Sequence, residues 1–186
     1  MHADLREDDA PDRYGSAHAG DHVSFEGSSL WRVRRKVGHD LVLWPGATVL
    51  VEDAEGRILL GLRKDNGEWA MPGGGAEHGG SFAATELDEL REEVGLEADR
   101  ADLIAFACVS DAKDHLITYP NGDVTHYFGL WFVLRRWRGE PVADGDELAR
   151  VEWFDREDLP QPMMHSSVVA LGYYARYLLT GLFQIG

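Results

Sequence analysis

Residues 73–96 of the chain read GGGAEHGGSFAATELDELREEVGL, a glycine-rich loop that runs into a segment with helical periodicity. Ser81 is a residue type that caps helix N-termini, and Gly95 suits the left-handed turn that ends many helices. We therefore predict a helix from about Phe82 to Val94. Placed at about 100° per residue, its apolar side chains form a single stripe. The stripe consists of Ala83, Leu87, Leu90 and Val94.

Carboxylates crowd one side of this predicted helix. Glu86, Glu89 and Glu93 lie along one flank of the apolar stripe, and Glu92 lies further round. Like charges spaced as Glu89 is from Glu92 and Glu93 repel each other by about 0.2–0.5 kcal/mol per pair. Arg91, the one Lys or Arg of the segment, points to the other flank. Such crowding calls for a compensating cation.

Two interpretations of these acids are open. The first is an amphipathic helix whose acidic side chains face water and bind nothing. The second is a metal site, because carboxylates in this number suit Mg²⁺ or Mn²⁺, which also bridge to substrate phosphates. The glycine-rich loop directly before the helix favours the metal site, since glycine lets backbone groups approach a ligand closely.

The segment resembles the Nudix box, a pattern of glycine, five residues, glutamate, seven residues, then Arg-Glu-apolar-any-Glu-Glu-any-Gly-apolar. Laid on residues 74–96, the pattern matches throughout its last eight positions, residues 89–96. The approach WAMPGG (69–74) is also similar to the family's, and the resemblance extends over about residues 40–160. It implies an α+β fold of the Nudix type, with a mixed β-sheet sandwiched between helices.

The resemblance implies a metal site and a mechanism. Glu89, Glu92 and Glu93, with the carbonyl of Gly73, would hold about one to three Mg²⁺ or Mn²⁺ ions. These ions would neutralise the diphosphate and activate a water for in-line attack on phosphorus. The general base would be Glu89 or Glu147, which lies in the loop before the strand-like run RVEWF. Glu147 could instead be an additional metal ligand or a solvated loop acid.

Substrate contacts are expected near the same loop. Gly73 and Gly74 would approach the substrate through their backbone, and Trp69 or Trp44 could stack a nucleobase. The alternative for both tryptophans is a place in the core, where aromatic residues beside strands usually lie.

Two positions depart from the box. Gly80 stands where the pattern has glutamate, and Asp88 stands where it has arginine. In the family these two residues support each other and orient the metal-binding glutamates. We therefore expect a functional but slow enzyme, which the double change Gly80→Glu with Asp88→Arg should accelerate. The competing hypothesis is that Arg91 or a residue elsewhere already supplies the support.

The predicted function is that of a MutT-like pyrophosphohydrolase. It would cleave a phosphoanhydride bond of a nucleoside triphosphate, or of a nucleoside diphosphate linked to another moiety. The alternative is a catalytically weak or silent Nudix-fold module that binds nucleotide. A purely structural acidic helix is a third hypothesis, disfavoured by the Glu92–Glu93 pair after a glycine loop.

Composition limits the partners. The net charge is −15, and nucleic acid is not expected as a partner because phosphate backbones are bound by clustered Lys and Arg. An acidic protein can still hold a small nucleotide through divalent metals. The sequence lacks a long apolar stretch and a signal peptide, so we expect a cytoplasmic protein without a membrane segment. Cys108, the single cysteine, lies in an apolar run and is expected to be buried.

The remainder of the chain is expected to form one domain, residues 23–186, behind a mobile acidic tail over residues 1–22. A short helix follows Ser28 and Ser29 and ends at Gly38. Residues 47–62 are predicted to form a hairpin, and Tyr119–Asp123 the turn of another. The strand-like runs are residues 41–51 with a break at Pro45–Gly46, 58–62, 103–109, 124–134 as a central strand, and 150–154 as the last strand.

The remaining signals are weaker. Residues 166–180 form a helix that is apolar nearly all round, and we predict that it either closes the sheet or contributes to a homodimer. His126 alternates with apolar residues and is expected to be a hydrogen-bonded core histidine. Asp111, Lys113, Asp114 and His115 are expected in a loop over the sheet, where a solvated charge run is the alternative to substrate contact.

Overall fold

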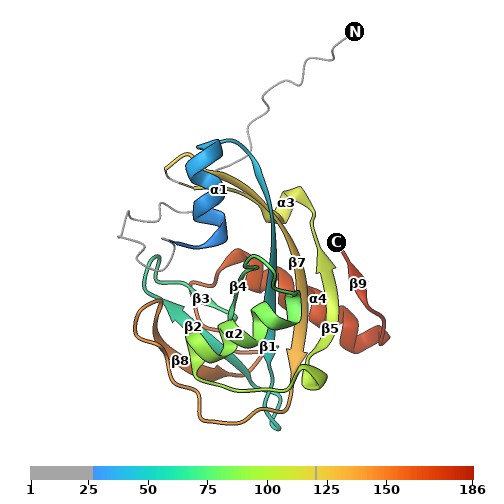
Figure 1. Ribbon diagram of the computed structural model, residues 1–186. Coiled ribbons are helices and arrows are strands. Elements are labelled where there is room, and N and C mark those ends of the chain that lie inside the picture. The colour runs from blue at the N-terminus through green and yellow to red at the C-terminus, as the bar shows by residue number, and fades with distance from the viewer. Residues whose placement is uncertain (1–26, 120) are drawn as a thin grey trace.

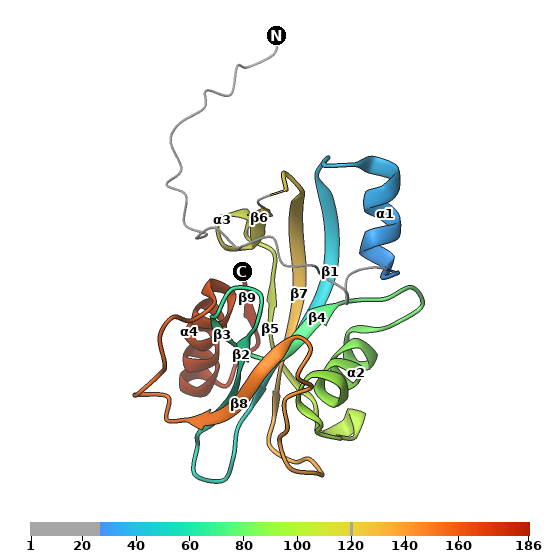
Figure 2. The same cartoon turned by 90° about the vertical axis from the view of Figure 1, so that its left-hand side faces the viewer.

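The computed structural model of the chain describes residues 27–119 and 121–186. The tail predicted for residues 1–22 lies outside the described residues, as does Pro120 of the predicted turn. Two β-sheets, with helices on both sides of the larger one, build the described part (Figure 1, Figure 2). The predicted α+β class is therefore confirmed. No helix of these residues has both the length and the apolar character needed to cross a membrane.

The larger sheet has the strand order β4-β1-β7-β5-β9, and β6 pairs with β7. Its centre is the parallel pair of β1 (Val42–Val51) and β7 (Val124–Leu134). The other strands are β4 (Gly73–Gly75), β5 (Ile104–Val109), β6 (Leu116–Thr118) and β9 (Gln184–Ile185). The central position predicted for residues 124–134 is confirmed, since β7 pairs with β1 on one side and β5 on the other.

The smaller sheet consists of β3 (Trp69–Ala70), β2 (Ile58–Arg63) and β8 (Leu148–Phe154), all antiparallel. The hairpin predicted over residues 47–62 is confined to its turn, where Glu52 and Ile58 form one antiparallel bridge, and beyond it β1 and β2 belong to different sheets. Both edges of β1 are already paired, one with β4 and the other with β7. The chain therefore turns away after β1, and β2 pairs with β3 and β8.

Two further strand predictions need correction. The break predicted at Pro45–Gly46 is absent, and β1 continues in register with Phe128 and Gly129 of β7. The carbonyl of Pro45 accepts a hydrogen bond from the N–H of Ala76, so the missing proline N–H faces the end of β4 instead of the central strand. Residues 150–154 lie in β8 but are not the last strand, because β9 follows near the C-terminus and pairs parallel with β5.

The two predicted helices before residue 100 are confirmed with their caps. α1 (Ser29–Val37) begins after Ser28, whose hydroxyl accepts a hydrogen bond from the N–H of Trp31. α2 (Phe82–Val94) begins after Ser81, whose hydroxyl accepts from the N–H of Ala84. Gly95 follows α2 in the left-handed conformation, with φ of 69°.

α4 (His165–Thr180) covers the face of the larger sheet opposite α2 (Figure 2). Its side chains Ala170 and Tyr174 are buried against that sheet, so the prediction that this helix closes the sheet is confirmed. The loop predicted around residues 111–115 is instead the short helix α3 (Ala112–His115), in which His115 is buried. The structure also has a 3-10 helix, η1 (Arg100–Asp102).

The core lies on both sides of the larger sheet. On the α2 side, Leu90 and Val94 pack against Val49 and Val51 of β1, and none of these four side chains is more than 1% exposed. Complete burial of side chains of this size contributes about 1.5–3 kcal/mol each. On the α4 side, Phe106, Trp131 and Tyr174 are among the buried residues. Cys108 of β5 is exposed, so its predicted burial is wrong; Ala107 and Val109 point into the core on either side of it.

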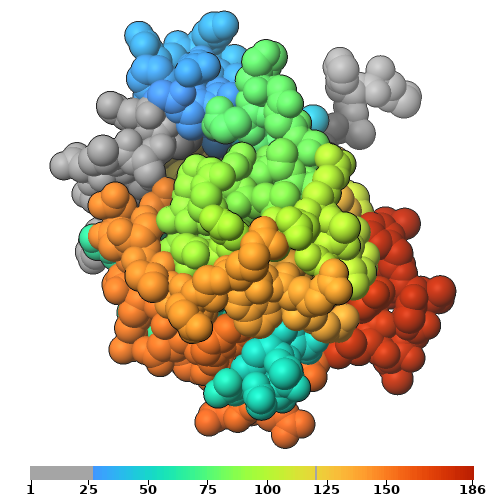
Figure 3. All heavy atoms as spheres, turned by 60° about the horizontal axis from the view of Figure 1, so that its bottom comes forward, coloured from blue at the N-terminus to red at the C-terminus, as the bar shows by residue number. Residues whose placement is uncertain are grey.

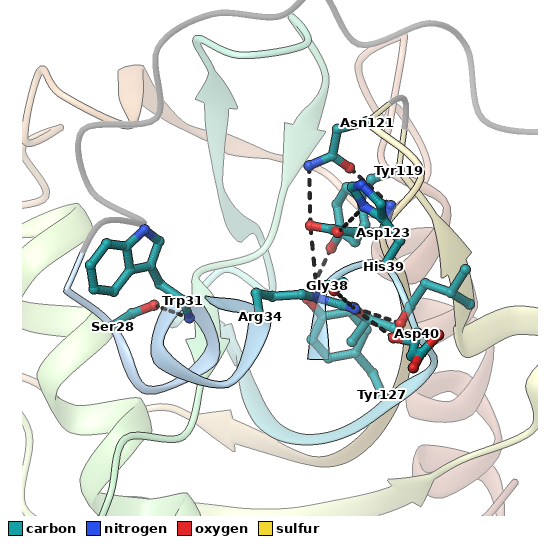
Figure 4. A network of polar contacts seen from close by, with 12 residues as sticks. Ser28, Trp31, Arg34, Gly38, His39, Asp40, Tyr119, Asn121, Asp123 and Tyr127 are labelled. Carbon is teal, nitrogen blue, oxygen red and sulfur yellow. Dashed lines mark hydrogen bonds and ion pairs between the residues drawn. The ribbon is translucent and has the colours of Figure 1, made fainter. Parts of the chain in front are cut away.

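α1 is fastened to the start of β7 through Arg34, which is 8% exposed (Figure 4). The guanidinium of Arg34 donates to the carbonyls of Gly38, Asp40 and Val124 and to the hydroxyl of Thr125. His39 adds a contact of 2.8 Å between its Nδ1 and the carboxylate of Asp123. These bonds hold α1 beside the glycine-rich loop that precedes α2.

Candidate active site

The glycine-rich loop lies directly against α2. β4 pairs with β1, so the loop is fixed at the sheet edge before the chain enters α2. A Cβ atom at Gly74 would collide with the carboxylate of Glu89, and one at Gly73 would collide with the backbone of Ala47 and Thr48. Glycine at these positions therefore allows the carboxylates of α2 to reach the backbone of the loop.

Glu93 and Glu89 are the carboxylates that contact this loop. Glu93 is 5% exposed, and its Oε2 accepts a hydrogen bond of 3.1 Å from the N–H of Gly73. Burial and the charge of Glu89 raise the pKa of Glu93 to about 8. Burial, followed by the charges of Glu147 and Glu92, raises the pKa of Glu89 to about 7. The carboxylates therefore repel one another in a site that water reaches poorly.

The loop that carries Glu147 lies against the C-terminal half of α2 (Figure 3, orange against green). The N–H of Asp144 donates to the carbonyl of Glu93, and the carboxylate of Asp144 accepts from the N–H of Glu147. The carbonyl of Glu147 accepts from the N–H of Lys64 just after β2. The structure thus brings Glu147 to the same place as Glu89 and Glu93, although it is distant in sequence.

Glu92 is the most exposed of the predicted ligands, with 67% of its side chain accessible. Its Oε1 lies 3.2 Å from a guanidinium nitrogen of Arg91, and the same nitrogen lies 3.0 Å from Asp88. Arg91 therefore lies on the flank away from Glu86, Glu89 and Glu93, as predicted, and Glu92 is the predicted ligand that it contacts. Arg91 bridges Glu92 and Asp88 on the outer surface of α2.

The buried face of α2 is also rotated from the predicted apolar stripe. Leu87 is only half-buried, whereas Thr85 and Glu86 are buried together with Glu93. Glycine at residue 74 leaves room for the carboxylate of Glu89, and Glu93 accepts a hydrogen bond from the N–H of Gly73. The helix therefore turns its carboxylates inward more than its sequence pattern indicates.

Arg63, at the end of β2, is a site residue that the sequence did not reveal. Its guanidinium donates to both carboxylate oxygens of Asp65, at 3.0 and 2.8 Å. Burial acts to lower the pKa of Arg63, but the acids Asp65, Glu93 and Glu147 outweigh it and raise that pKa. A cation thus faces the acidic site from the smaller sheet. Nothing in the spacing of ILLGLR distinguishes this arginine from others, because its neighbours come from distant segments.

Two tyrosines lie within reach of the charge of Arg63. The hydroxyls of Tyr119 and Tyr127 lie 2.9 Å apart, and burial raises the pKa of both. The positive charge of Arg63 opposes that rise at both hydroxyls. The predicted turn at residues 119–123 therefore contributes Tyr119 to the surroundings of Arg63.

The N-terminus of α1 binds the loop between β4 and α2 through Glu77. The N–H of Ser29 donates to both carboxylate oxygens of Glu77, at 2.9 and 3.0 Å, and the Ser29 hydroxyl donates at 2.6 Å. That hydroxyl in turn accepts from the N–H of His78 at 3.0 Å. An anionic side chain at a helix N-terminus is stabilised by the unpaired N–H groups there. Ser29, which lies outside the Nudix box, therefore holds this loop in place.

Comparison with known proteins agrees with this geometry. The family model of the NUDIX domain matches residues 42–171. The chain belongs to the Nudix hydrolase family. An RNA pyrophosphohydrolase of Novosphingobium aromaticivorans is 29% identical over 133 residues, which cover 62% of this chain and 80% of that protein. An ADP-ribose pyrophosphatase of Methanocaldococcus jannaschii is 31% identical over 112 residues, which cover 59% of this chain and 60% of that protein.

Solved structures show the same fold as this Nudix hydrolase. A MutT NUDIX hydrolase from Burkholderia pseudomallei superposes with a TM-score of 0.62 at 27% identity, covering 71% of this chain and 98% of that one. A UDP-X diphosphatase superposes with a TM-score of 0.59 at 17% identity, covering 84% of this chain and 73% of that one. Nudix hydrolases use divalent metal ions and act on small nucleotide substrates.

The carboxylates of this Nudix domain fit a divalent cation by their chemistry. Glu93 is buried and Glu89 is half-buried, both have raised pKa values, and a cation would remove their repulsion. Within residues 27–119 and 121–186, no group of three or more His, Cys, Asp or Glu side chains is already arranged to hold a metal ion. Binding therefore requires rotation of side chains, above all of Glu92, which points to Arg91 on the surface.

The structure places the remaining predicted residues away from the acids or in the core. Trp69 is 4% exposed and packs edge-on against Phe154, at 4.8 Å between ring centroids. This agrees with the alternative that Trp69 lies in the core. Trp44 is half-buried, with its indole next to Gly75. The ring Nε2 of His126 lies 2.7 Å from the carbonyl of Ser110, so this histidine is hydrogen-bonded and half-buried.

Proposed function

We propose that this chain is a metal-dependent pyrophosphohydrolase of small nucleotides. It would cleave a phosphoanhydride bond of a nucleoside triphosphate, or of a nucleoside diphosphate joined to another moiety. The observation that supports this most strongly is the packing of Glu89 and Glu93 against the Gly73–Gly74 backbone, with Glu147 beside them. In this proposal residues 23–186 act as a single domain that binds no nucleic acid.

The site residues would divide the chemistry among them. Glu89, Glu92, Glu93 and the Gly73 carbonyl would hold Mg²⁺ or Mn²⁺, which when bound neutralises the diphosphate and acidifies the attacking water. Glu89 would accept a proton from that water, and its pKa of about 7 supports this role because a base works best with a pKa near the operating pH. Glu147 is the second candidate for this role.

Substrate binding would use the loop and one cation. Gly73 and Gly74 would approach the diphosphate through their backbone, and Arg63 would donate hydrogen bonds to its oxygens. Trp69 would support this loop from the core, because only 4% of its surface is accessible. The relatives named above act on different substrates, RNA in one case and ADP-ribose in the other. The net charge of −15 favours a small nucleotide here.

A substrate screen tests the proposal. The chain would be incubated with nucleoside triphosphates, ADP-ribose, nucleotide sugars and dinucleoside polyphosphates, each with Mg²⁺ and with Mn²⁺, and products identified by mass spectrometry. Metal-dependent cleavage between two phosphates is the expected result. Glu140→Gln, which removes an exposed acid outside the site, is the matched control. Tight nucleotide binding without cleavage of any substrate would favour the alternative of a silent binding module.

A further inference from the structure

Glu86 is the most deeply buried acid of the described chain, with a side chain that is 0% exposed. Neither of its carboxylate oxygens has a hydrogen-bond partner within residues 27–119 and 121–186. The neighbouring hydroxyl of Thr85 is likewise buried and without a partner. Buried carboxylates are ordinarily paired with a cation, hydrogen-bonded or bound to a metal. Glu86 has none of these from the part of the chain that the structure describes.

The carboxylate of Glu86 belongs to the same group as the predicted ligands. Glu86, Leu90 and Glu93 are spaced four and three residues apart, so they share one face of α2. The charges that act on Glu86 are those of Glu93 and Glu89, both negative, and together with burial they raise its pKa. Glu86 therefore extends the row of acids on α2 that contains Glu89 and Glu93 by one further turn of the helix.

Glu52, another buried acid, shows how hydrogen bonds and nearby arginines stabilise a buried glutamate in this chain. Glu52 is 7% exposed, and Nε of Arg135 donates to its carboxylate at 2.6 Å. The hydroxyl of Tyr174 donates to the same carboxylate at 2.8 Å, and Arg156 lies 3.7 Å from it. No such partner reaches Glu86 from the described residues. The contrast indicates that the partner of Glu86 is not among the described residues and leaves its carboxylate open to a bound cation.

We propose that Glu86 is an additional metal-facing carboxylate, which neutralises the divalent cation held by Glu89, Glu92 and Glu93. This inference rests on the metal site of the proposed function. Position 86 falls among the unspecified residues of the box, so the family resemblance gives it no role. Besides the departures at Gly80 and Asp88, this chain therefore has a third distinctive feature within the box, the buried carboxylate of Glu86.

Metal binding and stability together test this proposal. Mn²⁺ would be titrated into the full chain and into Glu86→Gln, with the heat measured by calorimetry and free Mn²⁺ by electron paramagnetic resonance. We expect Glu86→Gln to bind Mn²⁺ about 10-fold or more weakly. The metal-free variant should have a higher Tm than the metal-free parent, because an unpaired buried carboxylate is removed. Thr85→Val, which removes the other partnerless buried atom without changing charge, should leave Mn²⁺ affinity unchanged.

Two further variants separate the possible outcomes. Glu86→Leu repeats the test with a buried apolar side chain, in case the amide of glutamine disturbs folding. Glu93→Gln reports on the proposed metal site itself. Unchanged Mn²⁺ affinity in Glu86→Gln and Glu86→Leu, with weaker binding in Glu93→Gln, would overturn the role of Glu86 and leave the proposed function standing. A parent chain that binds no Mn²⁺ would overturn both.

Discussion

Glu89 and Glu93 keep their protons to higher pH than exposed glutamates do, because Glu93 is buried and Glu89 half-buried beside other carboxylates. A carboxyl whose pKa is raised by folding stabilises the folded state fully below its unfolded pKa, and that contribution is lost as pH rises through the folded pKa. For these two residues the window runs from about 4.5 to about 8. We therefore expect the Tm of the metal-free protein to fall across this window.

Thermal denaturation in EDTA between pH 5 and 8 checks this expectation. Glu93→Gln cannot ionise at that position, so its Tm should fall less steeply with pH than that of the parent. Equal slopes for the two proteins would contradict the claim that burial and repulsion at Glu93 destabilise the metal-free fold.

Divalent metal should reverse the destabilisation that Glu89 and Glu93 cause in the metal-free protein. Mn²⁺ at millimolar concentration is expected to raise the Tm of the parent, since a ligand that binds only the folded state stabilises it by mass action. Glu93→Gln and Glu92→Gln should each reduce that rise, and Glu92→Gln the less, because Glu92 is exposed and paired with Arg91. Differential scanning fluorimetry measures the effect. A Tm indifferent to Mn²⁺, with no heat of binding, would remove the metal-site assignment.

Some site residues could be predicted from sequence because their relation is local. Glu89, Glu92 and Glu93 lie on consecutive turns of one helix, so spacing alone groups them. Arg63 could not be found this way, since Asp65 is a local partner but the site acids Glu93 and Glu147 come from α2 and from the loop before β8. The burial of Glu86 was also not foreseen, because the buried face of α2 is rotated from its apolar stripe.

At the scale of elements, α1 and α2 are joined through Glu77. Ser29→Ala removes the hydroxyl that bonds both Glu77 and the N–H of His78, but keeps the helix N–H. We expect turnover to fall about 2- to 5-fold, equivalent to ~1 kcal/mol or less, because the loop is held less firmly. Steady-state kinetics at saturating metal measures this. Ser166→Ala in α4, on the far side of the sheet, is the control, and an equal loss there would contradict the role of Ser29.

The contact between Ser29 and Glu77 also bears on the two departures from the Nudix box, Gly80 and Asp88. The structure offers the competing hypothesis a support elsewhere in the chain, because Ser29 holds the loop through Glu77 without residues of the usual type at positions 80 and 88. Arg91 does not supply this support, since it holds Glu92 on the outer surface of α2. We therefore expect Gly80→Glu with Asp88→Arg to be no faster than the parent. A clear rise in kcat for a normally folded double variant would show that the missing pair limits the enzyme.

Strand pairing was the part of the fold that sequence predicted least well. Residues 42–51 and 58–63 were recognisable as strands joined by a turn, which ordinarily means a hairpin. Their separation into two sheets follows from competition for the edges of β1, which β4 and β7 occupy. Such competition involves segments far apart in the chain, and local patterns do not contain it.

At the scale of the whole molecule, the C-terminal region leaves apolar surface uncovered. α4 closes the sheet with Ala170 and Tyr174, but Leu179 is 86% exposed and Leu182 is 67% exposed. The homodimer predicted from the sequence therefore stays a prediction, and Leu179→Glu should weaken it. Sedimentation equilibrium at high concentration should give the mass of two chains for the parent and shift toward one for the variant. A parent mass of one chain would contradict the dimer.

The central claim is that buried glutamates of α2 support metal-dependent hydrolysis of a nucleotide. The most direct measurement compares cleavage of the best substrate by the parent and by Glu93→Gln, each with Mn²⁺ and with EDTA. We predict turnover by the parent that requires Mn²⁺, and a loss of about 100-fold or more in Glu93→Gln. Cleavage that persists in EDTA, or that proceeds equally fast in a folded Glu93→Gln, would contradict the account.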